Sequence, residues 1–172
     1  VLLNMNLFSK MYIYIMAILI KDLEKFRLEH KNIIGTTFSC WDLLHCGHNI
    51  FLNDSKNNCD ILIVGLQTDP TIDRPEKNKP MQTLEEREIQ IKSCRYVDYY
   101  FIYDTEQNLY DSIKKLKPHI RFLGDDYVGK KFTGDDLPVK IVYHPRSKYG
   151  YSTTKLRKHI YNMELEKLNK LV

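Results

Sequence analysis

The sequence predicts a single α/β domain in which helices cover both faces of a parallel five-stranded sheet. From Asn32 onward, short apolar runs alternate with longer amphipathic stretches, which is the pattern of repeated strand–helix units. Residues 60–66 form a nearly continuous apolar run, as expected of a central parallel strand that is buried on both faces. The 172 residues suffice for one core and one pocket without disulfides or a structural metal.

The strands and helices are expected to alternate along the chain in a Rossmann-like arrangement. The predicted helices begin near Gly47, span Thr83–Arg95 and Gln107–Leu116, and resume in the tail, where Ser152 or Thr153 can cap the last one. Two long loops, residues 68–82 and 124–138, are expected to border the functional site. The predicted strands are Ile33–Phe38, Asp60–Leu66, Val97–Tyr103, His119–Leu123 and Val139–Tyr143.

The composition favours a small ligand over a polymer. The formal net charge is +4, and basic and acidic residues are interspersed without a basic block, so we expect no nucleic-acid partner. The cysteines lack a paired spacing and, with the histidines near them, fit no structural zinc site, so we predict reduced thiols and no protein-bound metal. They are Cys40, Cys46, Cys59 and Cys94.

An apolar run, Met11–Ile20, lies within residues 1–30, which we predict to be an N-terminal extension to a domain formed by residues 31–172. A membrane-spanning helix needs about 20 apolar residues, and a signal peptide would add a small-residue cleavage site. We therefore expect this run to be a peripheral helix or sequence upstream of the true start. The expected protein has no membrane span and is cytoplasmic.

Two histidines follow the first predicted strand. His45 and His48 flank Gly47, which permits a tight turn into the next helix. Ligands of open parallel sheets bind beyond the carboxyl ends of the strands, and a helix N-terminus attracts phosphate. Both imidazoles are therefore expected to face one phosphate, whereas a His-x-x-His spacing without that context is more often structural.

The stretch from Ser39 to His48, SCWDLLHCGH, resembles the signature of the cytidylyltransferase family within the HxGH nucleotidyltransferase α/β-phosphodiesterases. Three later segments resemble the motifs of that family in the same order. Residues 95–98 resemble its Arg-x-Val-Asp segment, residues 124–127 its Gly-Asp-Asp-Trp loop, and Arg146 with residues 152–154 its Arg-Thr-x-Gly-Ile-Ser-Thr-Thr motif. The resemblance covers about residues 33–160 and is closest to the glycerol-3-phosphate cytidylyltransferases.

The resemblance implies in-line attack by the phosphate of an acceptor on the α-phosphate of a nucleoside triphosphate, with pyrophosphate leaving. The implied reaction transfers CMP from CTP to glycerol 3-phosphate or a related polyol, sugar or amino-alcohol phosphate. Mg²⁺ is implied as the counterion of the triphosphate, largely hydrated. A homodimer is expected because relatives form one.

The resemblance also implies roles for individual residues. The catalytic residues are His45 and His48, with Lys77 or Lys79 as the cation of a flexible loop. Lys77 and Arg87 are the substrate-binding candidates, and the alternative for Arg87 is a surface ion pair. The nucleotide-binding candidates are Cys40, Trp41, Asp42, Gly47, Arg95, Asp126, Arg146, Ser152, Thr153 and Thr154.

Some of these residues have a structural alternative. Asp126 suits a turn as well as a nucleotide or metal contact. Residues 152–154 suit an ordinary helix cap, which has the same geometry as a phosphate seat.

Several departures from the family pattern leave the substrates open. Ser39 replaces a glycine, Trp41 replaces a phenylalanine, and one extra residue precedes Ser152, with Tyr151 in place of isoleucine. Residues 104–112 lack the basic residue that the glycerol-3-phosphate enzymes present to the acceptor, so glycerol 3-phosphate is only one candidate. The alternatives are adenylyl transfer from ATP, a non-catalytic nucleotide-binding module, and a piece of a class I aminoacyl-tRNA synthetase that lacks the Lys-Met-Ser-Lys-Ser partner motif.

Overall fold

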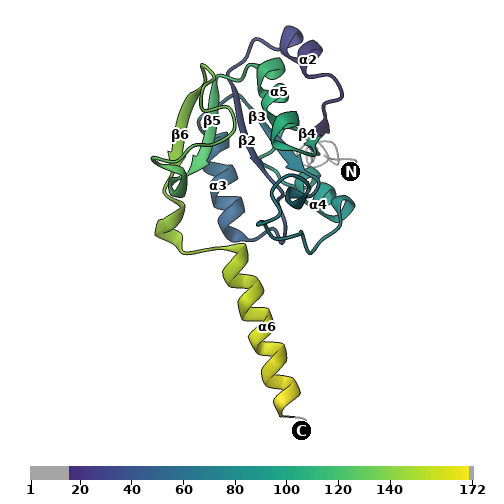
Figure 1. The fold of residues 1–172 in the computed structure, drawn as a ribbon. Coiled ribbons are helices and arrows are strands. Elements are labelled where there is room, and N and C mark those ends of the chain that lie inside the picture. The colour runs from purple at the N-terminus through teal and green to yellow at the C-terminus, as the bar shows by residue number, and fades with distance from the viewer. Residues whose placement is uncertain (1–15, 171–172) are drawn as a thin grey trace, which may run out of the picture.

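The computed structural model describes residues 16–170, which form an α/β domain with helices on both faces of a parallel sheet (Figure 1). The sheet has six strands in the order β1-β4-β3-β2-β5-β6, and all neighbouring strands run parallel. They are β1 (Ile18–Leu19), β2 (Ile34–Ser39), β3 (Ile61–Gln67), β4 (Tyr99–Tyr103), β5 (Ile120–Gly124) and β6 (Lys140–His144). The predicted α/β class is confirmed, with six strands instead of five.

The additional strand, β1, comes from the N-terminal extension. Ile18 and Leu19 pair with Tyr99 and Tyr100 of β4 at the edge of the sheet. The extension also contributes α2 (Leu23–Glu29), whose Phe26 is buried. The sequence-based interpretation of 11–20 as a peripheral helix is therefore wrong for residues 18 and 19, and residues 11–15 lie outside the described part.

Two hydrophobic clusters show which helices cover each face. Leu52 of α3 (Cys46–Lys56) and Ile91 of α4 (Leu84–Lys92) belong to one cluster. Leu109 and Ile113 of α5 (Glu106–Leu116) join Phe26 in the other. The fully buried β3 lies between these layers, which explains its uninterrupted apolar sequence.

The order of the strands creates a crevice between β2 and β5. From β2 the chain moves to β3 and β4 on one side, then returns to place β5 and β6 on the other. Ligands of such sheets bind outside the carboxyl ends of the strands at this switch point. The carboxyl ends of β2 and β5 are therefore the first place to look for a site.

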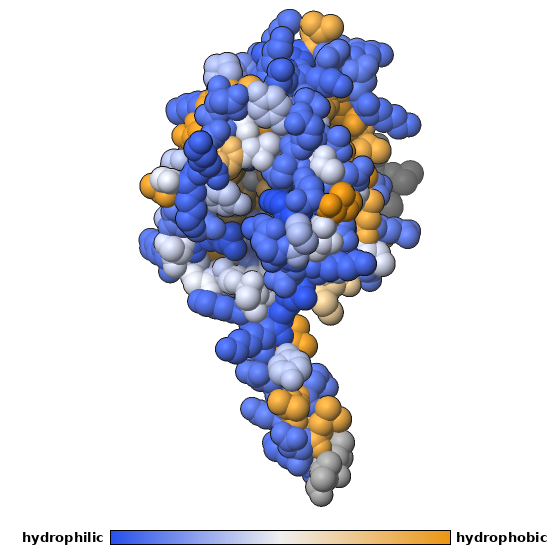
Figure 2. Space-filling model, viewed as in Figure 1, coloured by the Kyte–Doolittle hydropathy of each residue, from blue (hydrophilic) through white to orange (hydrophobic). Residues whose placement is uncertain are grey.

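The last helix, α6 (Thr153–Asn169), projects from the body of the domain (Figure 1). Ser152 caps it, and none of its residues is buried. Figure 2 shows hydrophobic side chains on its outer half. The exposed hydrophobic residues of α6 include Met163 and Leu168. Within residues 16–170, no helix combines the length and the apolar character needed to cross a membrane.

Lys117 ends α5 in the left-handed conformation, with φ 47° and ψ 59°. A side chain bearing a Cβ costs about 1–2 kcal/mol there, and glycine is the usual residue at this position. Lys117→Gly should therefore raise the free energy of unfolding by about 0.5–1 kcal/mol, after allowing for the greater freedom of glycine in the unfolded chain. Urea unfolding can measure this.

The matched control is Lys115→Gly, inside the same helix, which should lower the free energy of unfolding by about 1 kcal/mol. Equal losses in both variants would contradict the strain argument.

Candidate active site

A cavity of about 640 Å³ opens at the carboxyl ends of the strands. Its wall is formed by the end of β2, the start of α3, the segment after β3, the end of β5 with its following loop, and the start of α6. Segments far apart in the sequence thus converge at the switch point. The size suits a small-molecule ligand.

The two histidines lie together at the N-terminus of α3. His45 is the N-cap residue, and its Nδ1 accepts the backbone N–H of Gly47 at 3.1 Å. The Nδ1 of His48 accepts the backbone N–H of His45 at 3.2 Å. The ring centres are 4.0 Å apart, and both rings line the cavity.

These hydrogen bonds determine which nitrogen of each ring carries the proton. A neutral imidazole accepts through one nitrogen and donates through the other, so both rings carry their hydrogen on Nε2. The Nε2 of His45 donates to the Thr153 hydroxyl at 3.4 Å, which links α3 to the start of α6. The site therefore presents two imidazole N–H donors beside a helix N-terminus.

Both imidazoles are held neutral. Burial lowers the pKa of His48 to about 3, with further contributions from His45 and Arg146. The pKa of His45 is also lowered, first by burial and then by Arg146. The histidines can therefore donate hydrogen bonds at neutral pH but carry no positive charge in the free protein, and Arg146 supplies charge instead.

The lowered pKa values make the stability depend on pH. The unfolded chain takes up protons below about pH 6.5, whereas the folded chain resists protonation of His48 until about pH 3. The free energy of unfolding should thus be highest above pH 6.5 and fall between pH 6.5 and 3, with His48 accounting for about 2 kcal/mol between pH 7 and 5. Urea unfolding at the two pH values measures this.

His48→Asn should lose correspondingly less stability over the same pH interval. If its loss equals that of the original protein, His48 is not the source of the dependence.

The segment between β2 and α3 has an unusual backbone. Trp41 and Leu43 adopt φ of +51° and +49°, values that residues other than glycine rarely adopt. The buried Trp41 indole donates to Gly65 O at 3.0 Å, and the Leu43 N–H donates to the Gln82 side chain at 2.7 Å. These anchors hold the segment in a conformation that costs about 1–3 kcal/mol per residue.

Gly47 is required by close packing. A Cβ at this position would lie 2.7 Å from the Cβ of Tyr151 and 3.0 Å from His45. Any larger residue would push α3 away from the segment that precedes α6, where Thr153 meets His45. Gly47 thus acts by permitting the close approach of α3 to the segment that precedes α6.

Asp42 organises the loop after β3. It is buried, and its Oδ1 accepts the backbone N–H groups of Met81 and Gln82, each at 3.0 Å. Arg157 of α6 lies 3.7 Å from its Oδ2. The signature segment, the loop and α6 therefore meet at this carboxylate, which also lines the cavity.

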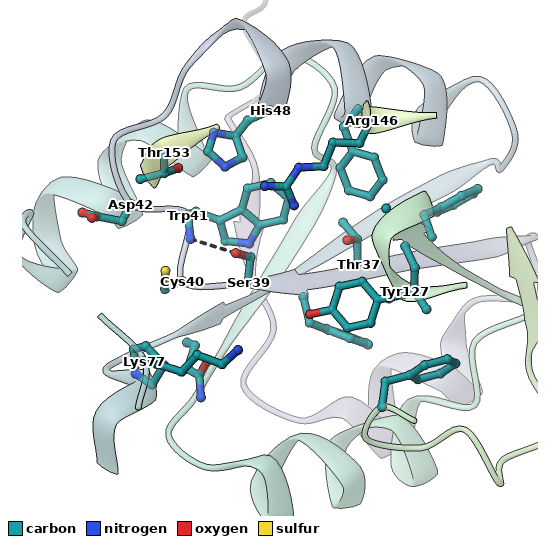
Figure 3. A pocket seen from close by; sticks show the side chains of 18 of the residues that line it. Thr37, Ser39, Cys40, Trp41, Asp42, His48, Lys77, Tyr127, Arg146 and Thr153 are labelled. Carbon is teal, nitrogen blue, oxygen red and sulfur yellow. Dashed lines mark hydrogen bonds between the residues drawn. The ribbon is translucent and has the colours of Figure 1, made fainter. Parts of the chain in front are cut away.

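Most of the sequence-predicted residues come together on the cavity wall. Figure 3 shows Arg146 extending over Trp41 toward His48, with Thr153 nearby and Lys77 entering from the opposite side. The predicted residues on the wall are Cys40, Trp41, Asp42, His45, Gly47, His48, Lys77, Arg146, Thr153 and Thr154.

Five other predicted residues, Arg87 among them, are not part of this wall. Lys79 is exposed and contributes only its carbonyl to Arg157, so Lys77 is the better candidate of the two lysines. Arg95 is exposed and lies over the Tyr96 ring. Asp126 lies 3.9 Å from Arg146, and Ser152 caps α6.

Arg87 does not fit the predicted substrate-binding role. It is 2% exposed and does not line the cavity. Its guanidinium donates to five backbone carbonyls, which tie the ends of β2 and β3 to the start of α4. This side chain therefore holds the framework of the site and has no surface ion pair either. The carbonyls belong to Cys40, Gln67, Thr68, Gln82 and Thr83.

The structure adds several wall residues that sequence reasoning missed. Arg121 and His144 come from β5 and β6 and are buried, while Arg74 and Glu106 form an ion pair at 2.7 Å. His144 Nδ1 also lies 3.0 Å from Asp54. An arginine within the apolar strand Ile120–Gly124 was the one signal available, since a charge there needs a partner.

The wall offers few ligands of its own to a metal ion, so it suits a metal ion that enters bound to a phosphate-bearing substrate. Among residues 16–170, no three or more His, Cys, Asp or Glu side chains are grouped as a metal site. Of the three carboxylates on the wall, Asp42 is occupied by backbone amides and Glu106 by Arg74, which leaves the exposed Glu76 as the third. The donor set therefore fits a Mg²⁺ whose ligands are mainly phosphate oxygens and water.

A family model described as cytidylyltransferase-like matches residues 36–159. The bifunctional protein HldE of Aliarcobacter butzleri is 33% identical over 155 residues, which are 87% of this chain and 31% of that protein. HldE of Campylobacter curvus is 37% identical over 131 residues, 76% of this chain and 27% of that protein. The chain thus spans less than a third of the length of these curated relatives.

Solved structures agree with the fold and the family. The lipopolysaccharide core biosynthesis protein from Thermoplasma volcanium is 27% identical, with a TM-score of 0.55 over 65% of this chain and 95% of its own. Pantoate-β-alanine ligase from Francisella tularensis, at 17% identity and a TM-score of 0.51, covers 82% of this chain and 76% of its own and shares the fold alone. The chain therefore belongs to the cytidylyltransferase-like family and is a nucleotidyltransferase.

Proposed function

We propose that the protein uses this cavity to transfer a nucleotidyl group from CTP or ATP to the phosphate of a small phosphorylated sugar or polyol. An oxygen of the acceptor phosphate attacks the α-phosphorus, the bond from the α-phosphorus to the bridging oxygen breaks, and pyrophosphate leaves. The observation that carries the proposal is the pair of neutral imidazole N–H donors on His45 and His48, placed at a helix N-terminus beside Arg146.

The residues on the wall match the charges of such a reaction. Negative charge grows on the non-bridging α-phosphate oxygens and on the leaving group, and fixed donors at those positions stabilise it. The Nε2–H groups of His45 and His48 suit the non-bridging oxygens of the α-phosphate. Arg146 with the first turn of α6, Thr153 and Thr154, suits the β- and γ-phosphates.

Lys77 has a separate role in this proposal. It enters the cavity opposite Arg146, from the segment that follows β3 (Figure 3). A cation there can hold the acceptor phosphate against the α-phosphate and reduce the repulsion between the two anions. Mg²⁺ bound to the triphosphate would supply further neutralisation of the leaving group.

The choice of acceptor has some support from a relative. The Thermoplasma volcanium protein bears a name from lipopolysaccharide core biosynthesis, and we therefore include saccharide phosphates among the acceptors to test. The motif resemblance favours CTP. ATP is the second candidate, because Ser39, Trp41 and Tyr151 differ from the pattern of the cytidylyl enzymes.

The test is a matrix of nucleotides against acceptors. Purified protein with Mg²⁺ is given CTP, ATP, GTP or UTP and, in turn, glycerol 3-phosphate, hexose and heptose 1-phosphates, and phosphoethanolamine. Pyrophosphate release with one pair, and the matching nucleotide-linked product by mass spectrometry, is the expected result. Binding of a triphosphate without release from any pair would instead identify a nucleotide-binding module. Sedimentation of the same sample tests the proposed homodimer.

A further inference from the structure

Two arginine side chains on the cavity wall have donors without a partner. Within residues 16–170, three buried side-chain polar atoms lack a hydrogen-bond partner, and two of these are Nε atoms, of Arg74 and Arg121. Both arginines line the cavity. Arg74 Nε has the Asp73 carboxylate 3.8 Å away, beyond hydrogen-bond range, whereas Arg121 forms no ion pair with a described carboxylate. A buried donor without a hydrogen-bond partner is costly, so these two, and Arg121 above all, point to a ligand that accepts from them.

Arg121 is built into the wall more firmly than the exposed cations. It is 5% exposed, and its guanidinium carbon lies 4.9 Å from the Phe38 ring centre and 4.8 Å from that of Phe132. Its Nη1 donates to the Thr133 carbonyl. The two rings pack against the guanidinium group, whose N–H groups can form hydrogen bonds only in its own plane, at its edge.

The charge of Arg121 has no direct counterion among the described residues. The carboxylates that act on it, Glu106 and Asp135, do so without forming an ion pair within 4.0 Å. Burial lowers the pKa of Arg121 to about 10, so the group remains a cationic donor at neutral pH. Its hydrogen-bonding edge is therefore available to a ligand.

Glu106 joins Arg121 to Arg74. Its Oε1 lies 2.7 Å from Arg74 Nη2, and its Oε2 accepts from the hydroxyl of Thr133, whose carbonyl binds Arg121. Gln67 Oε1 accepts from the same Arg74 nitrogen at 2.7 Å. We call these five residues the acceptor network: Gln67, Arg74, Glu106, Arg121 and Thr133.

The acceptor network is distinct from the residues assigned to the nucleotide phosphates. It comes from β3, β5, α5 and the loops after them, whereas His45, Arg146 and Thr153 come from α3, α6 and the segment before α6. The cavity joins the two sets. One substrate can therefore react at the histidines while a remote part of it contacts the network.

The chemistry of the network indicates what that remote part is. Glu106 would repel a phosphate or carboxylate, yet it can accept from a hydroxyl group while the arginine Nε atoms donate to the same kind of group. Hydroxyl groups both donate and accept, so a vicinal diol matches a mixed set of arginine, carboxylate and hydroxyl partners. The nearby Phe132 and Tyr127 rings, 6.3 Å apart, add apolar faces for C–H groups.

We infer that the acceptor network binds the hydroxyl-bearing end of the acceptor and that Arg121 determines specificity for it. The identity of the bound molecule as the acceptor rests on the proposed function, whereas the binding of hydroxyl groups by the network does not.

The first test observes the unpartnered donor directly. Arginine Nε–H groups give separate ¹⁵N–¹H NMR signals, and the signal of Arg121 is the one lost in Arg121→Lys. We expect this signal to shift on addition of sorbitol, methyl mannoside or methyl glucoside at millimolar concentration, and to stay in place with inorganic phosphate. A shift with inorganic phosphate alone, or no shift with any probe, would overturn the inference.

The second test uses the substrate pair found by the matrix. Arg121→Lys should raise the KM for a sugar phosphate about tenfold, which corresponds to one lost buried hydrogen bond, and leave the KM for the nucleotide and kcat within about twofold. The matched control is Arg27→Lys, on α2 away from the cavity, which should change none of these. An equal rise in both KM values, or a fall in kcat alone, would contradict a role in acceptor selection.

The two tests separate the inference from the proposed function. If no pair reacts but the polyol probes shift the Arg121 signal, the proposed function fails and the network remains a polyol-binding site. If a pair reacts but Arg121→Lys leaves the acceptor KM unchanged and the signal unmoved, the function stands and the inference fails.

Discussion

Replacing His48 with asparagine should reduce turnover by about a thousandfold and leave the fold intact. The asparagine Oδ1 can take the place of Nδ1 and accept the backbone N–H of His45, so the start of α3 is preserved. The variant lacks the distal N–H that faces the phosphate. Steady-state pyrophosphate release with the pair found by the matrix measures the loss, and circular dichroism and unfolding at pH 7 check the fold.

A second variant distinguishes the donor from the mere presence of a side chain. His48→Gln carries an amide N–H near the position of Nε2, so it should recover part of the lost rate, about tenfold or more over His48→Asn. Retention of full activity in His48→Asn would remove His48 from the mechanism. Because the pKa of His48 in the free protein is about 3, kcat/KM should also show no titration step from His48 between pH 6 and 8.

Arg87→Met should lower the free energy of unfolding by about 3–5 kcal/mol. Methionine has a similar length and apolar volume, but it leaves the five carbonyl acceptors of Arg87 without their donor in a buried place. The ends of β2 and β3 would separate from the start of α4, and Cys40 of the signature segment would lose its contact with Arg87. Urea unfolding at pH 7 measures the change.

Arg95→Met is the matched control, because Arg95 is exposed and its substitution should change stability by less than about 0.5 kcal/mol. A stable Arg87→Met variant with a raised acceptor KM would restore the substrate-binding role expected from the sequence. Arg87→Lys should fall between the two, since a single ammonium group cannot reach all five carbonyls.

The part of the site that sequence could predict is local. His45, Gly47 and His48 lie within one turn of helix, so their mutual geometry follows from a helix N-terminus and a short turn. Thr83 and Glu86 form a capping box at the start of α4, which is equally local. Such features depend on neighbours in the chain and need no knowledge of the fold.

The roles of the buried arginines could not be read in this way. The carbonyl partners of Arg87 come from three separate stretches, and the rings around Arg121 come from β2 and from the loop after β5. An amphipathic helix or an apolar strand shows where such a residue lies along the chain. It does not show which backbone groups the sheet will bring to it.

The choice between Lys77 and Lys79 could not be predicted from the sequence either. Their spacing in the sequence offers no reason to choose between them. The choice comes from the path of the loop, which is held at Met81 and Gln82 by Asp42 and at Lys79 by Arg157. With those points held, Lys77 is the lysine that reaches the cavity.

The edge position of β1 has a consequence for the order in which the protein is made. Its only strand partner among the described residues is β4, so Ile18 and Leu19 cannot pair until Tyr99 and Tyr100 have been synthesised. A nascent chain therefore carries this apolar stretch unpaired through much of its synthesis, at the stage when exposed strands most readily associate with other chains. Among the six strands of this sheet, the one synthesised first is therefore one of the last to find its place.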